Sequence, residues 1–371
     1  MGTRLGVAVL LVWMSSVSAA SAASAEGEFV ALTYNVAGLP QGISGGDPTT
    51  NSPLISPLLN AYDVVLLQED WRDPIEAAPV LFFHDDIVSE ADHPYQSEPA
   101  PPPMGSDLRR FPTGPPLIAD GLNQLARFPF SDVEHVMWET CYGEFAVEVV
   151  EAILSGSGLD EPIDDAGFGG LVEGGAADCG AQKGFTFSRL RLADGLEVDL
   201  YNLHGEAGSS PADQEASAAG FVQLATFMNA RSLGRAVIVG GDTNLHNLTN
   251  ADDGKTWTTF VDATGVTDVC DAVDCGDDDG EIDKFAFRSG GGVALTPLSH
   301  RFERERFKRS DGEPLSDHDA LAVRFAWHSM DASDDVTPEL PLTGGPGAAP
   351  LVAALLSVGA LVARARHRPS R

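Results

Sequence analysis

The sequence predicts an α/β protein in which strands and helices alternate along the chain. Apolar runs that end on polar residues predict buried strands at 63–69 and 236–244, and an alternating run that follows Asp317-His318 predicts another at 320–325. The segments 144–154 and 211–231 carry apolar side chains at helical spacing instead. Because helices separate the strands and no internal repeat is present, this pattern favours α/β over an all-β fold.

The N-terminal half begins with a strand at 28–35, which a glycine and a proline end. A short helix is predicted at 53–62, and the continuous apolar run at 63–69 indicates a strand buried on both faces. Residues 84–120 lack periodicity and are rich in Pro, Asp and Ser, so we expect a surface insertion there. Next come strand-like segments at 121–128 and 132–138, a helix at 144–154 and a Gly- and Asp-rich loop at 155–179.

The C-terminal half begins with a predicted β-hairpin of strands 184–192 and 196–203. The Asp194-Gly195 pair between them is a strong signal for a two-residue turn. The remaining elements are a helix at 211–231, a strand at 236–244, a helix at 255–262, and strands at 282–287 and 320–325.

Polar residues stand at the ends of these predicted strands. A carboxylate at the tip of a buried strand must be solvated, paired or bound to a cation. Two strands that end on Asn35 and Glu69 could place an amide and a carboxylate side by side. Each polar residue alone is most simply a turn or structural residue, but six such strand ends in one chain indicate a shared site. The later members are His204, Asp242, Asn244, Asp283, Asp317 and His318.

The chain is strongly acidic. It has 371 residues, 43% of them hydrophobic, and a formal net charge of −32. The first 25 residues and the stretch after Gly344 together carry five arginines and no acids, so the chain between them carries −37. Such a charge repels polyanions, which makes a long nucleic acid a poor expected partner. Solubility, or a salty habitat, explains the charge equally well.

The N-terminal segment has the features of a secretory signal peptide. Arg4 precedes the apolar run 5–14, and small residues follow. We therefore expect 1–25 to be a signal peptide, cleaved between Ala20 and Ala25, and the protein to be secreted.

The C-terminal segment 340–371 resembles the cell-wall sorting signal of Gram-positive bacteria. It contains Leu340-Pro-Leu-Thr-Gly344, then the apolar stretch 348–363 and an Arg-rich end. In such signals a sortase cuts between Thr and Gly and joins the protein to the wall peptidoglycan. A plain membrane anchor is the alternative, although the apolar stretch is short for a full transmembrane helix. We expect 329–339 to be a linker to this segment.

Four cysteines in an exported chain are expected to be oxidised. Cys270 and Cys275 are five apart and could close a loop, which leaves Cys141 to pair with Cys179. Four cysteines allow three pairings in all.

Five short motifs occur in order along the chain: Thr33–Gly38, Leu67–Glu69, Gly240–Asn244, Ile282–Asp283 and Ser316–His318. They resemble the motifs of the endonuclease/exonuclease/phosphatase superfamily and cover residues 28–327. Within it, the likeness is closest to the secreted bacterial and neutral sphingomyelinases. Leu39-Pro40 after the first motif, and Cys179-Gly180 shortly before Lys183-Gly184, are similar to theirs.

The resemblance implies a DNase I-like fold for residues 26–328. This is a four-layer sandwich in which two mixed β-sheets pack face to face, with helices outside. The active site of that superfamily lies at one end of the strands, in agreement with the polar strand ends.

The resemblance also implies a metal site. Glu69 would bind Mg²⁺ with Asn35 nearby, and Asp317 would face a second metal position. Oxygen ligands favour Mg²⁺, with Mn²⁺ or Co²⁺ as alternatives, over a structural zinc.

The family roles give each remaining residue a task. His318 would be the general base that takes a proton from the attacking water, with Asp283 orienting it. Asp242 would position the water and Asn244 the phosphate. His204 would hydrogen-bond the phosphate or protonate the leaving oxygen. Lys183 would bind substrate, since Asp178 and Lys183 stand five apart, like a pair in some animal neutral sphingomyelinases.

The expected function is hydrolysis of sphingomyelin to ceramide and phosphocholine by a monomer at a membrane surface. The alternatives are an extracellular endonuclease of the same fold and a wall-anchored adhesin without catalysis. Lys284 departs from the family, which usually has an aromatic residue there. The basic segment 301–309 could meet lipid phosphates or be a solvated helix face, and 277–280 could be a calcium loop or an acidic turn.

Overall fold

The structure is a computed structural model that describes residues 25–39, 46–72, 82–101, 119–142 and 183–330. The predicted helix at 144–154, the loop at 155–179 and the sorting segment lie outside these residues, as does nearly all of the predicted signal peptide. Within the described part of the chain, no helix is both long enough and apolar enough to cross a membrane.

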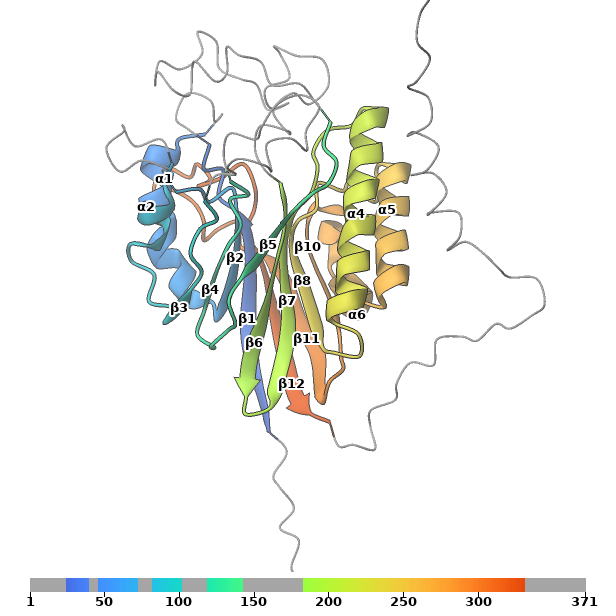
Figure 1. Cartoon of the computed structure of the whole chain (residues 1–371). Coiled ribbons are helices and arrows are strands. Elements are labelled where there is room, and N and C mark those ends of the chain that lie inside the picture. The colour runs from blue at the N-terminus through green and yellow to red at the C-terminus, as the bar shows by residue number, and fades with distance from the viewer. Residues whose placement is uncertain (1–24, 40–45, 73–81, 102–118, 143–182, 331–371) are drawn as a thin grey trace, which may run out of the picture. The chain divides into compact units, whose positions relative to one another are not determined.

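Two six-stranded mixed sheets form the centre of the fold (Figure 1). The first contains, in spatial order, β11 (Val293–Phe302), β12 (Leu321–Ser329), β1 (Glu26–Asn35), β2 (Val64–Gln68), β4 (Asn123–Ala126) and β3 (Tyr95–Gln96). The second contains β5 (Glu134–Met137), β6 (Gly184–Ala193), β7 (Leu196–His204), β8 (Val237–Asp242), β10 (Asp283–Arg288) and β9 (Thr267–Asp268). Among the described strands, each sheet has one parallel pair, β1 with β2 and β7 with β8, and the other neighbours are antiparallel.

Helices cover the outer faces of the sheets (Figure 1). On one side lie α1 (Pro48–Ile55), the 3₁₀ helix η1 (Ser56–Ala61) and α2 (His84–Val88). On the other side lie α4 (Pro211–Arg231) and α5 (Ala251–Thr264), and the connection to β10 contains α6 (Val269–Ala272) and the 3₁₀ helix η3 (Gly276–Gly280). This is the predicted four-layer, DNase I-like sandwich.

The strand β2 is buried on both faces of the first sheet. Val64 and Leu66 belong to the apolar cluster between the sheets, whereas Val65 and Leu67 belong to the cluster beneath α1, η1 and α2. Alternate residues of a strand point to opposite faces, so a continuous apolar run fits only a strand buried on both sides. A third cluster, which includes Phe221 of α4 and Phe260 of α5, packs these two helices on the second sheet.

Two predicted segments differ from the structure. The helix predicted at 53–62 begins earlier, at Pro48, and changes at Ser56 into η1. A proline occupies an early position of each helix, where its missing N–H costs nothing. The predicted insertion at 84–120 is wrong over its first part, because α2 and β3 lie there and Ile87 is buried against η1 and β2.

The strand β11 was not predicted from the sequence. This strand contains Pro297, next to a break in register, and several of its alternate residues are exposed. A proline is tolerated at a sheet edge because no neighbouring strand needs its N–H, and β11 lies at one edge of the first sheet. The basic segment 301–309, which follows, is a strand end and a loop and not a helix.

Candidate active site

Strand register brings the polar strand ends to one end of the sandwich. In the first sheet, Asn35 pairs with Gln68, which places it beside Glu69. In the second sheet, His204 pairs with Asp242 across the parallel strands β7 and β8, and Asp242 pairs with Asp283 across the antiparallel strands β8 and β10. Three of the predicted site residues therefore start from neighbouring backbone positions.

Asn35 connects the two sheets. Its Nδ2 donates to Glu69 Oε1 at 3.1 Å and to Asp242 Oδ2 at 3.1 Å, while its Oδ1 accepts from the backbone N–H of Ala37 at 3.0 Å. The backbone oxygen of Asn35 accepts from Ser316 Oγ at 2.7 Å, so the loop that carries His318 is tied to the same residue. One amide thus orients two carboxylates from different sheets.

His318 and Asp283 form a hydrogen-bonded pair. Nδ1 of His318 lies 2.8 Å from Asp283 Oδ2, and Nε2 lies 3.6 Å from Asp242 Oδ2. Burial lowers the pKa of His318, but the charges of Asp283, Asp242 and Asp317 outweigh it and raise this pKa well above 6.5. Burial also raises the pKa of Asp283, to about 6, even though the charge of His318 lowers it. The imidazole is therefore strongly basic, and both of its nitrogens have partners, because Nδ1 faces Asp283 and Nε2 lies 3.4 Å from Asn35 Nδ2.

His204 is almost fully buried. Its Nε2 lies 3.3 Å from Asp242 Oδ2 and 3.9 Å from Glu69 Oε1, and its backbone oxygen accepts from Trp138 Nε1 at 2.8 Å. Burial, followed by the charge of Lys183, lowers the pKa of His204 to about 3. A neutral imidazole in this position can donate a hydrogen bond without adding charge.

Glu69 follows β2 in a left-handed backbone conformation with φ of 55°. The chain passes close to it: a Cβ on Gly38 would lie 2.2 Å from the backbone oxygen of Glu69. Burial and the nearby charge of Asp317 raise the pKa of Glu69 to about 7. The hydrogen bond from Asn35 and the charges of His318 and Lys183 offset this only in part, so a bound cation would relieve the remaining negative charge.

The other predicted site residues surround this centre. Asn244 also has a positive φ, 52°, and its Nδ2 donates to the backbone oxygen of Gly205 at 3.2 Å. Asp317 is exposed, and Lys183, just before β6, is close enough for its charge to lower the pKa of Glu69. Asp178 lies outside the described residues.

The residues present fit a hard divalent cation. Carboxylates from Glu69, Asp242, Asp283 and Asp317 outnumber the positive charges around them, and carboxylate oxygens are the ligands that Mg²⁺ prefers. Ligand atoms of Asp242, Asp283 and His318 lie within 4.8 Å of one another. A second group within that distance, formed by the two bonded cysteines and His300, is unsuitable because disulfide sulfurs are not thiolates.

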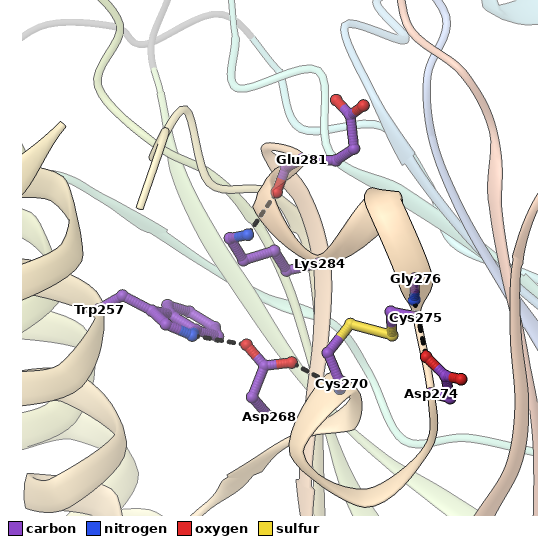
Figure 2. Close-up of a disulfide and its surroundings, with 8 residues drawn as sticks. All are labelled: Trp257, Asp268, Cys270, Asp274, Cys275, Gly276, Glu281 and Lys284. Atoms are coloured by element: carbon purple, nitrogen blue, oxygen red, sulfur yellow. Dashed lines mark hydrogen bonds between the residues drawn. A yellow bond between two sulfur atoms is a disulfide. The ribbon is translucent and has the colours of Figure 1, made fainter. Parts of the chain in front are cut away.

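The structure contains the predicted disulfide between Cys270 and Cys275, shown in Figure 2. The other predicted pairing, Cys141 with Cys179, involves a residue outside the described part of the chain. A groove of about 650 Å³ lies between α4 and α5 but includes none of the predicted site residues, so we do not assign the chemistry to it.

A buried polar network behind Glu69 was not predicted. Asp70 Oδ2 accepts from Asn123 Nδ2 at 2.9 Å and lies 2.8 Å from His84 Nδ1. His84 and Asp70 are 3% and 0% exposed at their side chains, so this pair fixes the residue next to Glu69. Asp70 directly follows the Leu67–Glu69 motif, so its position could have indicated a role near the site. His84 lies in the segment that was predicted to be an insertion.

Known structures share this fold. The D. rerio TDP2 structure humanized by 14 mutations is 15% identical, covers 80% of this chain and 98% of its own, and has a TM-score of 0.50. Staphylococcus aureus beta toxin is 13% identical, with 80% and 99% coverage and a TM-score of 0.50. An endonuclease/exonuclease/phosphatase from Beutenbergia cavernae is 14% identical, with 80% and 71% coverage and a TM-score of 0.50. The fold is therefore DNase I-like.

Proteins similar in sequence belong to a narrower functional class than the structures that share the fold. The chain is 31% identical over 314 residues to sphingomyelinases from Mycobacterium bovis and Mycobacterium tuberculosis. The match covers 81% of this chain but 53% of those proteins, so the chain spans about half the length of the relatives it matches. No protein-family model matches the sequence. Fold and sequence likeness together support the endonuclease/exonuclease/phosphatase superfamily.

Proposed function

We propose that this protein is an exported, Mg²⁺-dependent phosphodiesterase that hydrolyses sphingomyelin to ceramide and phosphocholine. The observation that carries the proposal is the convergence of Asn35, Glu69, His204, Asp242 and the His318–Asp283 pair at one end of the two sheets. The likeness to mycobacterial sphingomyelinases supports the choice of substrate.

The cation would bind through Glu69, with Asp317 nearby, and when bound it would neutralise negative charge that builds on the phosphate oxygens during attack. Asn35 holds the Glu69 carboxylate through its amide N–H in this structure. For Asn35 itself to serve as a ligand, its amide oxygen would have to turn away from Ala37.

His318 is the proposed general base. A bound cation would offset the carboxylate charges that raise the pKa of His318, so that Nε2 would be unprotonated. Nε2 would then accept a proton from the attacking water, while Nδ1 donates to Asp283. The Asp283 carboxylate holds the imidazole in the tautomer whose Nε2 carries no proton, and it stabilises the imidazolium that forms. In this structure Nε2 lies 3.4 Å from Asn35 Nδ2, which the attacking water would have to replace as its partner. Asp242, whose Oδ2 is 3.6 Å from Nε2 of His318, is placed to accept a hydrogen bond from the same water.

Three further side chains would bind the phosphate group of the substrate. The neutral His204 donates through Nε2, Asn244 offers its amide, and the Lys183 ammonium supplies a positive charge. These donors stabilise charge that increases in the transition state. Hydrogen bonding to a phosphate oxygen suits His204 better than proton donation, because burial keeps its imidazole neutral.

The fold alone does not choose between lipid and nucleic acid, since D. rerio TDP2 with a single-strand DNA product is also similar, with a TM-score of 0.50. Charge favours the lipid. The chain between the two ends carries −37, which opposes a polyanion but not a zwitterionic headgroup. The basic segment 301–309 gives little relief, because Arg301, Arg304 and Arg309 are all paired with carboxylates.

A substrate panel tests the proposal. The purified protein is given Mg²⁺ and, at one enzyme concentration, sphingomyelin liposomes, phosphatidylcholine liposomes or plasmid DNA. We expect phosphocholine from sphingomyelin and intact plasmid. Nicked plasmid with intact lipid would instead assign the site to a metal-dependent endonuclease.

For localisation, we propose secretion through the segment 1–25 and attachment to the cell wall through 340–371. The order of the Leu-Pro-Leu-Thr-Gly motif, the apolar stretch and the arginines supports this. Sortase and peptidoglycan are then partners of the C-terminus. The catalytic domain, residues 26–328, works as a monomer at a lipid surface.

A further inference from the structure

The two members of the His318–Asp283 pair come from segments with little regular structure of their own. Asp283 is the first residue of β10, directly after the loop that contains η3. His318 lies in a stretch of bends between β11 and β12. Their 2.8 Å contact therefore depends on what fixes these two loops relative to each other.

Arg304 bridges the two loops. Its Nε lies 2.6 Å from Oδ2 of Asp319, the residue after His318. On the other side its Nη1 lies 2.9 Å from Asp278 Oδ1, and its Nη2 lies 3.5 Å from Glu281 Oε1. Asp278 is in η3, and Glu281 is two residues before Asp283. One guanidinium thus contacts both loops that carry the pair.

The guanidinium is itself held in place. It stacks over the ring of Phe302, with Cζ 4.8 Å from the ring centre, and Phe302 is 7% exposed. Arginine is planar, has donors on several edges and stays charged at all working pH values. These properties allow one side chain to connect three carboxylates in fixed directions.

The loop before Asp283 is anchored from its other side as well (Figure 2). Lys284 is 5% exposed and donates through Nζ to the backbone oxygen of Glu281. Its ammonium also lies 5.9 Å from the ring centre of Trp257. The disulfide Cys270–Cys275 closes the chain just before η3. Because this loop is anchored to its own sheet, the contacts of Arg304 fix the His318 loop to that sheet.

We propose that Arg304 is a positioning residue that holds His318 against Asp283. It touches neither side chain of the pair and acts through Asp319 on one loop and through Asp278 and Glu281 on the other. The kinetic part of the test rests on the proposed phosphodiesterase activity, whereas the spectroscopic part does not.

The spectroscopic test uses ¹⁵N-histidine-labelled full-length protein with nine histidines. The Nδ1–H proton of His318 is assigned as the resonance lost in His318→Ala, and its hydrogen bond to Asp283 gives a downfield shift. We expect Arg304→Met to lose that shift. The control is Arg301→Met, in the same segment, whose guanidinium pairs with Glu303 alone among described residues and is 71% exposed. It should keep the shift.

The kinetic test measures phosphocholine release from sphingomyelin in detergent micelles. Arg304→Met should lower kcat about 10- to 100-fold, the usual cost of losing an outer-shell partner, and leave KM within about twofold. In a His318→Ala background it should cost nothing further, because the two residues act as one unit.

If Arg304→Met does not fold, Arg304→Lys replaces it. A lysine keeps the charge but offers a single point of contact, so the downfield shift should again be lost. A wild-type shift in whichever variant folds would overturn the inference. Loss of the shift in a protein that hydrolyses no sphingomyelin would uphold the inference and reject the proposed function.

Discussion

Burial and neighbouring charges shift the pKa values of single residues in the site. Glu69 has a pKa of about 7 because it is buried and faces Asp317. His318 has a pKa well above 6.5 because three carboxylates outweigh its burial. Sequence patterns could place both residues at strand ends, but no pattern reports how buried an end is or which charges from other strands face it.

Removing the proposed cation tests the role of Glu69. Excess chelator should abolish phosphocholine release, and added Mg²⁺ should restore it. Glu69→Gln removes the charged ligand, so the Mg²⁺ concentration needed for half-maximal activity should rise at least about tenfold. Glu215→Gln, an exposed change on α4, should leave that concentration unchanged. Full activity in excess chelator would contradict a metal-dependent mechanism.

The buried His84–Asp70 pair makes stability depend on pH. Burial lowers the pKa of His84, but the charge and hydrogen bond of Asp70 outweigh it and raise this pKa above 6.5. The folded state then binds a proton more tightly than the unfolded state. The stabilisation is complete below about pH 6.5 and is lost as pH rises through the folded pKa.

Denaturant unfolding across that range measures this contribution. His84→Gln should lower the free energy of unfolding by about 3 kcal/mol at pH 6 and by less at pH 9. The control His328→Gln lies on an exposed position of β12 and should leave the pH dependence as it is. An equal loss at both pH values would show that the His84 charge does not contribute.

At the scale of whole elements, apolar runs predicted the buried strands well, and spacing predicted α4 to the residue. These patterns work where one environment covers an entire element. β11 and α2 were missed because their residues meet mixed surroundings. β11 lies at an exposed edge and contains Pro297, and α2 is a helix of five residues, of which two are buried.

Pairing between the sheets also escaped prediction. Asn202 Oδ1 accepts from Gln68 Nε2 at 2.7 Å, and Asn202 Nδ2 donates to the backbone oxygens of Leu67 and Asn123 at 2.9 and 3.1 Å. These fully buried contacts join β7 to β2 and β4 across the sandwich. A polar residue within a strand gives no sign of its partner on another sheet.

Asn202→Leu should therefore destabilise the fold. The change leaves buried donors and acceptors without partners, at a cost of about 3 kcal/mol. Thermal and denaturant unfolding would measure it. Glu215→Leu, at an exposed position of α4, should change stability by no more than about 0.5 kcal/mol. Equal effects of the two changes would argue against a structural role for the network.

At the scale of the whole molecule, the resemblance to a known superfamily predicted more of the fold than the composition did. Composition indicated an acidic protein with a large core, and alternation indicated α/β. The motifs from Thr33 to His318 implied the two-sheet sandwich, which the structure confirms. No physical pattern in the chain fixes how two sheets face each other, since that depends on contacts far apart in sequence.

Processing of both ends is expected before the protein acts. Mass spectrometry of protein released from cell walls should find a new N-terminus between Ser21 and Gly27 and a C-terminus at Thr343. A wall-associated species that retains Arg371 would contradict sorting by a sortase.

The measurement that tests the central claim most directly is the initial rate of phosphocholine release from sphingomyelin liposomes with Mg²⁺, for wild type and His318→Ala. General acid–base catalysis contributes about 10²- to 10⁴-fold, so His318→Ala should slow release by that factor while liposome binding stays the same. His328→Ala, an exposed control, should match wild type. Release by His318→Ala at the wild-type rate would contradict the account of the site.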